Sequence, residues 1–279
     1  MTHTTPKLLV ASLFLTLSMS ACFHTEDDPD AHDEAATISI EAGNVLSEST
    51  STVTATAEID LNNSMELSGT VTVANDTDGS VSKVEIRNAN FGADGDLVVA
   101  LEDNGNGTWS VPAGQTVMHD MHMRHGAGGL YISISDVEGE ILRGQIAPHG
   151  IYAERIHLMA ITGVTTDGHG NAFITVNSES NTVLAYVHTH DITGTITAVD
   201  IVDSTDDSVI LNLTEETDSD AWSGTETLDA AQWEALESDE YYVLVKTDDN
   251  TDGELKGTIA IDMMHDDDMP MDDGHNHMH

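Results

Sequence analysis

The chain repeats its own pattern once, at an interval the size of a domain. A Gly-Glu phrase closes each of two stretches of alternating apolar residues, at 139–146 and again at 253–259. Each phrase follows a tyrosine, Tyr131 and then Tyr242, and the Trp-Ser pair at 109–110 returns at 222–223. These landmarks lie 111 to 114 positions apart. A unit of that length is a whole domain rather than a solenoid repeat of roughly 20–50 residues.

The local patterning predicts an all-β chain. Apolar and polar residues alternate in segments such as 67–73, and Asp/Asn/Gly clusters such as 75–79 and 103–107 separate them. Short strands at such spacing predict two tandem antiparallel β-sandwich domains, at 38–147 and 157–262. One short helix is expected in each, at 229–237 and at its counterpart, 118–126. About 105–110 residues are enough for each domain to bury a core.

The order of these landmarks resembles the chordin-type (CHRD) domain, over 38–147 and over 157–262. The resemblance implies two tandem copies of this domain. The family pattern has Ala-His-Ile-His-x-Gly where this chain has Lys-Val-Glu-Ile-Arg at 83–87 and Ala-Val-Asp-Ile-Val at 198–202. The family's Tyr-Val-x-Val-His-Thr is also altered, at 131–135 and 242–247. Activities that depend on those histidines are therefore not implied here.

Residues 1–22 have the layout of a bacterial lipoprotein signal peptide. Lys7 precedes an apolar run from Leu8 to Leu17 that is too short to span a bilayer, and small residues lead to Cys22, the only cysteine. We expect a lipid anchor at Cys22, and an ordinary signal peptide with a chance cysteine is the alternative. Phe23 follows where an inner-membrane retention signal would have Asp, which favours the outer membrane. The sequence leaves open whether the protein faces the periplasm or the exterior.

The charge of the chain excludes one class of partner. Fifty acidic residues against eight basic ones give a formal charge of −42, which repels nucleic acid. Residues 23–37 contain six acidic and no basic residues and are predicted to be an unfolded linker. An acidic surface serves solubility in salty surroundings or attracts cations, and composition alone does not separate the two.

The octamer at 118–125 interleaves methionine with histidine. Thioether and imidazole groups together suit copper in either oxidation state, so this segment predicts a copper site. If the segment is helical, Met118/His122 and Met121/His125 form pairs on one face. The alternative for any single methionine is core packing. The candidate ligands are Met118, His119, Met121, His122, Met123 and His125.

Residues 263–279 repeat this composition in what is predicted to be a disordered Met/His/Asp tail. Methionine gains nothing from burial in such a tail, so its presence indicates metal binding; the alternative is an inert solvated terminus. The candidate ligands are His265, Met269, Met271, His275, His277 and His279.

A third candidate is the His-x-His at His188 and His190. In a strand these side chains share a face. When the two halves are aligned, His188 occupies the position of Val73 in the first half. A histidine that replaces a core valine needs a polar partner. His157 or Met159 is a possible source of one. The alternative is that these histidines lie at a solvent-exposed strand end and bind no ligand.

Other chemistry has weaker support in the sequence. Asp248–Gly253 matches the first half of a calcium-binding EF-hand loop, but Ile259 stands where a bidentate Glu is required, so we predict a turn, with weak calcium binding as the alternative. No hydrolase signature is present. The predicted function is a lipid-anchored, cell-envelope binding protein for copper. A structural or adhesive module that binds protein or glycan is the alternative, and a copper redox enzyme is disfavoured.

Overall fold

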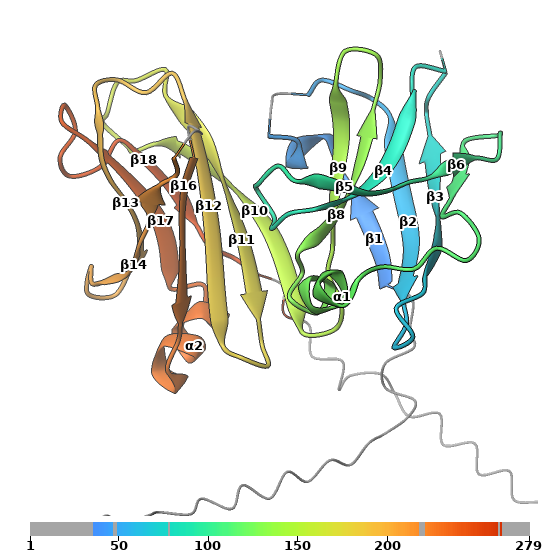
Figure 1. Cartoon of the computed structure of the whole chain (residues 1–279). Helices are drawn as coiled ribbons and strands as arrows, with labels where there is room; N and C mark the ends of the chain where they lie inside the picture. Colours follow the sequence, from blue (N-terminus) through green and yellow to red (C-terminus); the bar gives the residue numbers. More distant parts are fainter. Residues whose placement is uncertain (1–35, 47–48, 78, 218–220, 262, 264–279) are drawn as a thin grey trace, which may run out of the picture. The chain divides into compact units, whose positions relative to one another are not determined.

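The computed structural model describes residues 36–46, 49–77, 79–217, 221–261 and 263. The predicted lipidation at Cys22, most of the acidic linker and the tail ligands from His265 onward lie outside these residues. Within them the chain is built of antiparallel strands with two short α-helices, which confirms the predicted all-β, sandwich-like fold class (Figure 1).

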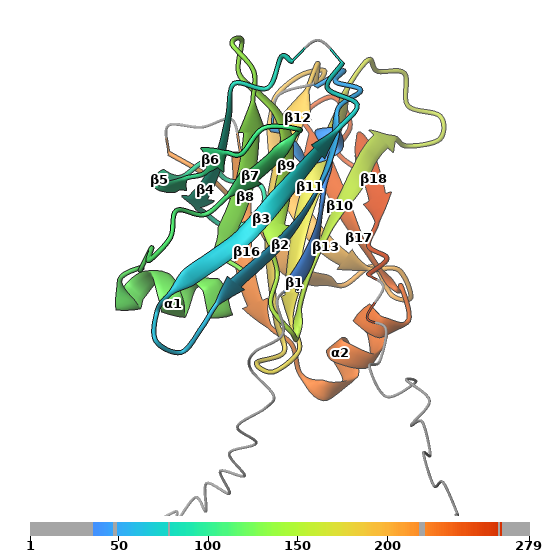
Figure 2. The ribbon, with the colours of Figure 1, turned by 90° about the vertical axis from the view of Figure 1, so that its right-hand side faces the viewer.

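The first half contains nine strands, one 3-10 turn and one helix. They are β1 (Ala36–Ile40), η1 (Ala42–Asn44), β2 (Thr54–Leu61), β3 (Leu67–Ala74), β4 (Lys83–Asn88), β5 (Asp96–Ala100), β6 (Glu102–Asp103), β7 (Thr108–Ser110), α1 (His119–Gly126), β8 (Leu130–Ser135) and β9 (Glu140–Ile146). Figure 2 shows β1, β2 and β3 side by side with α1 near the β2–β3 turn, where the Val117 amide donates to the Met65 carbonyl.

The second half repeats this order of elements. They are β10 (Ile151–Ala160), β11 (His169–Asn177), β12 (Thr182–His190), β13 (Ile196–Asp203), β14 (Val209–Asn212), β15 (Thr214–Glu215), β16 (Ala221–Thr227), α2 (Ala230–Glu237), β17 (Tyr241–Thr247) and β18 (Leu255–Thr258). Strand β10 begins six residues before the predicted boundary at 157, because Ile151 already pairs with Asn177 of β11.

The strand order of the two halves is the same. The first half has sheets β1-β2-β3-β7-β6 and β5-β4-β8-β9, and the second has β10-β11-β12-β16-β15 and β14-β13-β17-β18. In the second half, pairing of Met159 with Lys256 joins β10 to β18 and makes one nine-stranded sheet. In the first half the corresponding contact is the single bridge between Glu41 and Arg143. The repeat in the sequence therefore corresponds to a repeat in topology.

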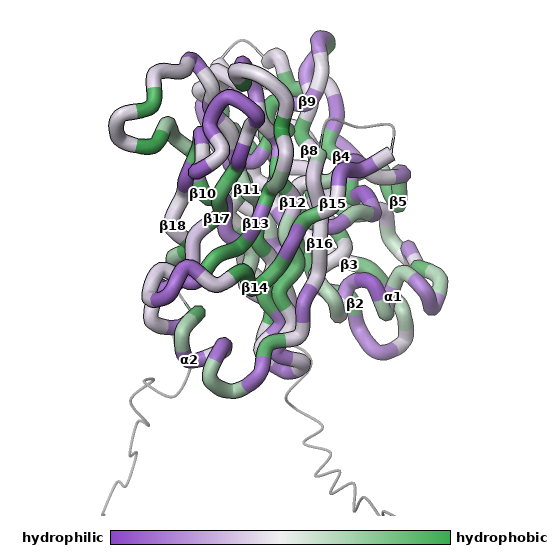
Figure 3. The backbone as a smooth tube through the Cα atoms, turned by 90° about the vertical axis from the view of Figure 1, so that its left-hand side faces the viewer, coloured by the Kyte–Doolittle hydropathy of each residue, from purple (hydrophilic) through white to green (hydrophobic). Residues whose placement is uncertain are grey.

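Each half has its own apolar core, produced by the period-two pattern of its strands. In β2 the alternate residues Ala55, Ala57, Ile59 and Leu61 are buried. In β11 and β12 the buried set includes Ile174 and Val187. Each fully buried aliphatic side chain stabilises the fold by about 1.5–3 kcal/mol. In Figure 3 hydrophobic residues follow the strands and hydrophilic ones mark the loops.

The two helices differ in how they begin. Asp229 caps α2 by accepting hydrogen bonds from the amides of Ala231 and Gln232, and the Gln232 side chain returns one to complete a capping box. Helix α1 has no side-chain cap and no buried residue.

Among the described residues, no helix has the length and hydrophobicity needed to cross a bilayer.

The repeated Gly-Glu phrase stabilises the fold in both halves. Arg143 lies 4.1 Å above the ring of Tyr131, and Lys256 lies 3.3 Å above the ring of Tyr242. In each half the glutamate accepts a hydrogen bond from a hydroxyl seven residues upstream: Ser133 bonds Glu140, and Thr247 bonds Glu254.

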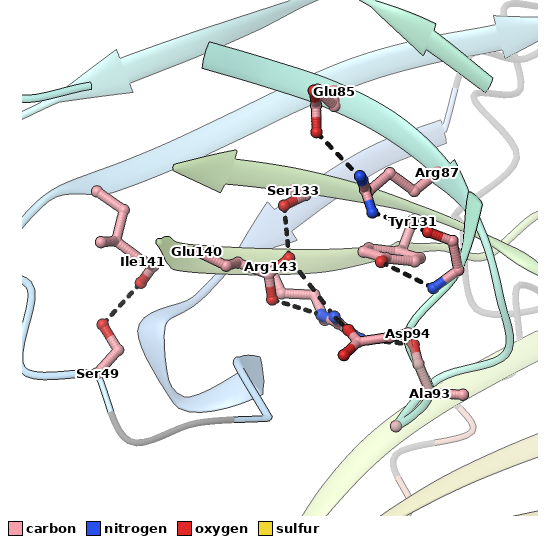
Figure 4. Close-up of polar contacts among 12 residues, drawn as sticks. Ser49, Glu85, Arg87, Ala93, Asp94, Tyr131, Ser133, Glu140, Ile141 and Arg143 are labelled. Atoms are coloured by element: carbon pink, nitrogen blue, oxygen red, sulfur yellow. Dashed lines mark hydrogen bonds and ion pairs between the residues drawn. The ribbon is translucent and has the colours of Figure 1, made fainter. Parts of the chain in front are cut away.

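The Arg143 guanidinium is 1% exposed and bonds to Glu140, Asp94 and the Ala93 carbonyl, as Figure 4 shows. The landmark residues of the repeat therefore have a structural role.

Candidate functional site

One face of β10, β11 and β12 gathers most of the histidines of the second half. Register places His157 opposite Asn171 and Asn171 opposite His188, so these three side chains lie in one row. In the next row His169 lies opposite His190. The opposite face of the same strands packs into the core.

Met159 extends the second row. The β10–β11 pairing ends at Leu158 and Gly170, the residues just before Met159 and just after His169, and both Met159 and His169 line one cavity with His190. The His169 and His190 rings are 5.5 Å apart between centroids and tilted by 39°. Met159 is 69% exposed. We call Met159, His169 and His190 the edge triad.

The edge triad borders a cavity of about 460 Å³. Its described walls are the outward face of β10–β12 and residues from 42–46 and 49–50. The residues that line it are Ala42, Gly43, Val45, Leu46, Ser49, Thr50, Arg155, His157, Leu158, Met159, His169, Gly170, Asn171 and His190. None of them is Asp or Glu, although acidic residues outnumber basic ones fifty to eight. The cavity is thus lined by imidazole, thioether, amide and hydroxyl groups and one guanidinium.

Gly170 allows β11 and β12 to lie close together. A Cβ on Gly170 would lie 2.5 Å from the carbonyl oxygen of His188, closer than side chains approach backbone atoms. Any larger residue would push β11 away from β12 and separate His169 from His190.

The histidine row has no counterpart in the first half. Trp109 pairs with Val71 and Trp222 with Val187, which aligns the equivalent strands. On that alignment the pair Thr54 and Ala74 replaces His169 and His190. The fold therefore forms without imidazoles at these positions.

The same alignment corrects the sequence interpretation of His188. Val187, which is fully buried, is the residue equivalent to Val71, so His188 corresponds to the exposed Thr72 and not to Val73. Its partner is a backbone carbonyl: Nε2 donates to the Gly92 oxygen at 2.6 Å. The ring also packs edge-on against Phe173, with centroids 5.8 Å apart.

Burial lowers the pKa of His188, and the charge of nearby His190 lowers it further, against the opposing effect of the Gly92 hydrogen bond. The ring is therefore neutral at neutral pH, with Nε2 occupied. His190 makes its ring contact with His169, a residue that the sequence interpretation did not include. A signal for it was present, because the polar turn at 178–181 fixes the hairpin register that pairs 169 with 190.

The Met/His octamer forms the helix α1, which decides between the two arrangements that the sequence left open. Met118 and Met123 are 68% and 62% exposed, whereas Met121 packs against the first core. Nδ1 of His122 is buried and lacks a hydrogen-bond partner among the described residues. Burial and the nearby His122 lower the pKa of His125. The octamer thus offers two neighbouring, half-buried imidazoles, while His119 is exposed.

Methionine dominates the exposed apolar surface. Six large hydrophobic side chains are exposed among the described residues: Leu97, Met118, Met123, Val137, Met159 and Val209. Three of the six are methionines, and all three belong to segments that also carry histidine. Exposed thioethers gain nothing from core packing, so this placement suits ligation.

The described part of the chain contains no preformed metal site built from carboxylate oxygens. No group of three or more His, Cys, Asp or Glu is placed there to hold a metal ion. The Asp248–Gly253 segment is the loop between β17 and β18, as predicted, and Asp248 accepts a hydrogen bond from the Thr195 amide. Asp76 accepts hydrogen bonds from Ser80 and Val81 in another turn. These carboxylates stabilise turns.

Comparison with known proteins identifies one domain. A search of curated proteins and a search of solved structures return no match. Residues 158–259, which run from β10 through β18 and include the edge triad, match the CHRD domain family. The match to this family covers most of the second half of the chain.

Proposed function

We propose that this is a non-enzymatic cell-envelope protein that binds copper, and that the edge triad is its principal site. The observation that carries the proposal is the row of Met159, His169 and His190 at the edge of β10–β12, with a ring contact of 5.5 Å and an exposed thioether. The nearby His157 borders the same cavity.

The choice of copper rests on ligand chemistry. Two imidazoles and one thioether form a soft donor set, which suits Cu(I), whereas Zn(II) prefers imidazole, thiolate and carboxylate. Calcium and magnesium take oxygen ligands, and the described residues that line this cavity include no carboxylate. The negative charge of the whole chain favours the approach of any cation.

Helix α1 and the tail are proposed as additional copper sites. The direct test is titration of the intact protein with Cu(I), with bound ions counted by native mass spectrometry. Replacing Met118, Met121 and Met123 by Leu keeps the apolar volume nearly constant, so the fold should tolerate the change. We expect Cu(I) binding at α1 to weaken, with any Zn(II) binding by His122 and His125 retained. Deleting 264–279 should remove a separate set of ions.

The controls for this titration are unfolding curves for each variant, which should match those of the unchanged protein. If the unchanged protein binds no copper at micromolar concentration, copper binding is wrong, and the structural or adhesive module replaces it. If it binds copper but neither variant changes the count, the ions lie elsewhere and only the α1 and tail sites are withdrawn.

We further propose that the first half is a second CHRD copy and that a lipid at Cys22 anchors the protein. The equal strand order of the halves and the cation–π pairs Arg143/Tyr131 and Lys256/Tyr242 support the first point. The signal-like pattern of 1–22 supports the second.

Anchoring has a clear expected outcome. The substitution Cys22→Ser should abolish incorporation of radiolabelled palmitate and leave an unprocessed precursor, because the thiol is the acylated group. Labelling and membrane fractionation of cells that express each form would show this. The lipoprotein assignment fails if the serine variant still incorporates label.

A further inference from the structure

Arg155 is a cation on the wall of the cavity beside the edge triad, and it is the one Lys, Arg, Asp or Glu among the described residues that line this cavity. Its Nε atom is buried and has no hydrogen-bond partner in the part of the chain that the structure describes. The whole chain holds eight basic residues and fifty acidic ones, so an arginine to which the described residues present no carboxylate needs an explanation.

Two other arginines show how this chain satisfies a guanidinium that is partly or fully buried. Arg143 bonds to Glu140, Asp94 and a backbone carbonyl. Arg87 likewise bonds to Glu85 and to the Gly95 carbonyl. Leaving a buried polar group unpaired costs roughly 1–3 kcal/mol, and more for a charged one. A ligand from outside the described chain would remove that cost.

The guanidinium is held in place by its surroundings. A Cβ on Gly43 would lie 2.2 Å from one terminal nitrogen of Arg155 and 2.3 Å from its Cζ, so the head group lies directly against the backbone of η1. On β10, Arg155 is on the same face as His157, two residues away, and it lies opposite Phe173. The planar head is therefore positioned at the cavity wall rather than extended into solvent.

A second unpaired group lies in the same wall. Oδ1 of Asn171 is buried and lacks a hydrogen-bond partner among the described residues. Asn171 is a diagonal neighbour of Arg155 across β10 and β11, within reach of a long side chain. A ligand that offers an oxyanion to Arg155 and a hydroxyl to Asn171 would satisfy both.

We propose that this cavity binds a small organic carboxylate that also carries a hydroxyl group. The guanidinium fork matches the two oxygens of a carboxylate. A volume of about 460 Å³ lies within the range of small-molecule sites. The described residues that line the cavity include no Asp or Glu that would repel a carboxylate. This site does not depend on copper binding.

The test is calorimetric titration of the metal-free, full-length protein with lactate, with acetate and phosphate as comparison probes. Lactate should bind more tightly than acetate, because acetate lacks the hydroxyl group. Phosphate tests the choice of a carboxylate, and phosphate binding as tight as lactate binding would contradict that choice. Arg155→Gln should weaken lactate binding by roughly 10–100-fold, the range expected for loss of a charge-assisted hydrogen-bond pair. Arg124→Gln removes an exposed arginine elsewhere and should change nothing.

A second variant keeps the arginine in place. Asn171→Asp adds a carboxylate beside Arg155, which should pair with it internally and exclude lactate without removing any cation. Arg155→Gln should leave the copper count of the protein unchanged, so that failure here and failure of the copper proposal are separate results.

Two further outcomes would overturn the proposal. One is equal lactate affinity in the unchanged protein and in both cavity variants. The other is lactate binding that appears only after Glu48→Gln, because Glu48 lies between Leu46 and Ser49 in the sequence and its carboxylate would then be the native occupant.

Discussion

Replacing His169 by threonine and His190 by alanine is expected to remove one copper ion and leave the protein folded. These are the residues of the first half at the equivalent row, Thr54 and Ala74, so the fold already accepts them. Loss of an outer-shell partner alone costs 10–100-fold in metal affinity, and loss of two direct ligands should cost more than that. Native mass spectrometry would show the missing ion, and competition with a Cu(I) chelator would measure the affinity.

Two further variants make this result specific. Met159→Leu should weaken the binding of Cu(I). His169 and His190 should still bind Cu(II), because Cu(II) relies on imidazole ligands. The reciprocal double change Thr54→His and Ala74→His should create a weaker additional site in the first half. An unchanged copper count in the His169→Thr, His190→Ala variant would place the principal site elsewhere, even if the protein binds copper.

Replacing Glu254 by leucine is expected to destabilise the second half by about 3–5 kcal/mol, as loss of one member of a buried polar network does. The carboxylate is fully buried and accepts four hydrogen bonds. The donors are the Thr166 and Thr247 hydroxyls at 2.6 and 2.8 Å, the Thr193 amide at 2.9 Å and the Asn250 amide at 3.1 Å. Leucine would leave the backbone N–H of Thr193 without its acceptor, and a backbone amide cannot rotate to find another. It would also remove the acceptor of the Asn250 side-chain amide and of both threonine hydroxyls.

Urea unfolding followed by tryptophan fluorescence would measure this loss. A Trp109→Phe background confines the signal to Trp222 and Trp233, which both lie in the second half. Asp252→Leu changes an exposed acid in the same loop and should alter the free energy of unfolding by no more than about 0.5 kcal/mol. If Glu254→Leu lowers the free energy of unfolding by no more than Asp252→Leu does, the buried carboxylate is not part of a stabilising network.

The same residue predicts a pH dependence. Burial raises the pKa of Glu254, but hydrogen bonds from Thr166, Thr193, Thr247 and Asn250 outweigh it and hold the pKa below 4.5. The folded state therefore binds fewer protons than the unfolded state. The contribution of the ionised Glu254 carboxylate to stability is complete above pH 4.5 and is lost as the pH falls below that value. The leucine variant should lack this part of the acid transition.

Much of the fold could be predicted from the sequence because its determinants are local or repeated. Alternation of apolar residues is enough to identify strands such as β2 and to assign their buried face. Asp229, with Gln232 three residues later, marks the start of α2. The recurrence of Tyr131 and Arg143 as Tyr242 and Lys256 reflects a pairing that both halves need for stability. These patterns depend on the period of a strand or a helix, which a sequence displays directly.

The candidate sites were only partly predictable, because they depend on which strands lie side by side. His190 was found as part of a His-x-His motif, but its partner His169 lies 21 positions away in the chain and adjoins it through β-sheet register. The role of His188 was misjudged for the same reason: its carbonyl partner, Gly92, comes from the other half. Arg155 belongs to no sequence motif, and it becomes notable because the described residues present no carboxylate to it.

By itself, the sequence determined that this chain is an all-β protein with a repeated pattern, strongly acidic and rich in histidine and methionine. It also placed both helices. Only the tertiary structure decided that Met159, His169 and His190 share one edge and that Met121 faces the core while Met118 and Met123 do not. The physical reason is that a ligand set or a cavity is formed by residues distant in sequence. Their proximity depends on strand register and on the packing of loops against a sheet. A hairpin turn such as 178–181 can indicate the register of one strand pair, but no local pattern encodes which other strands and loops adjoin that pair.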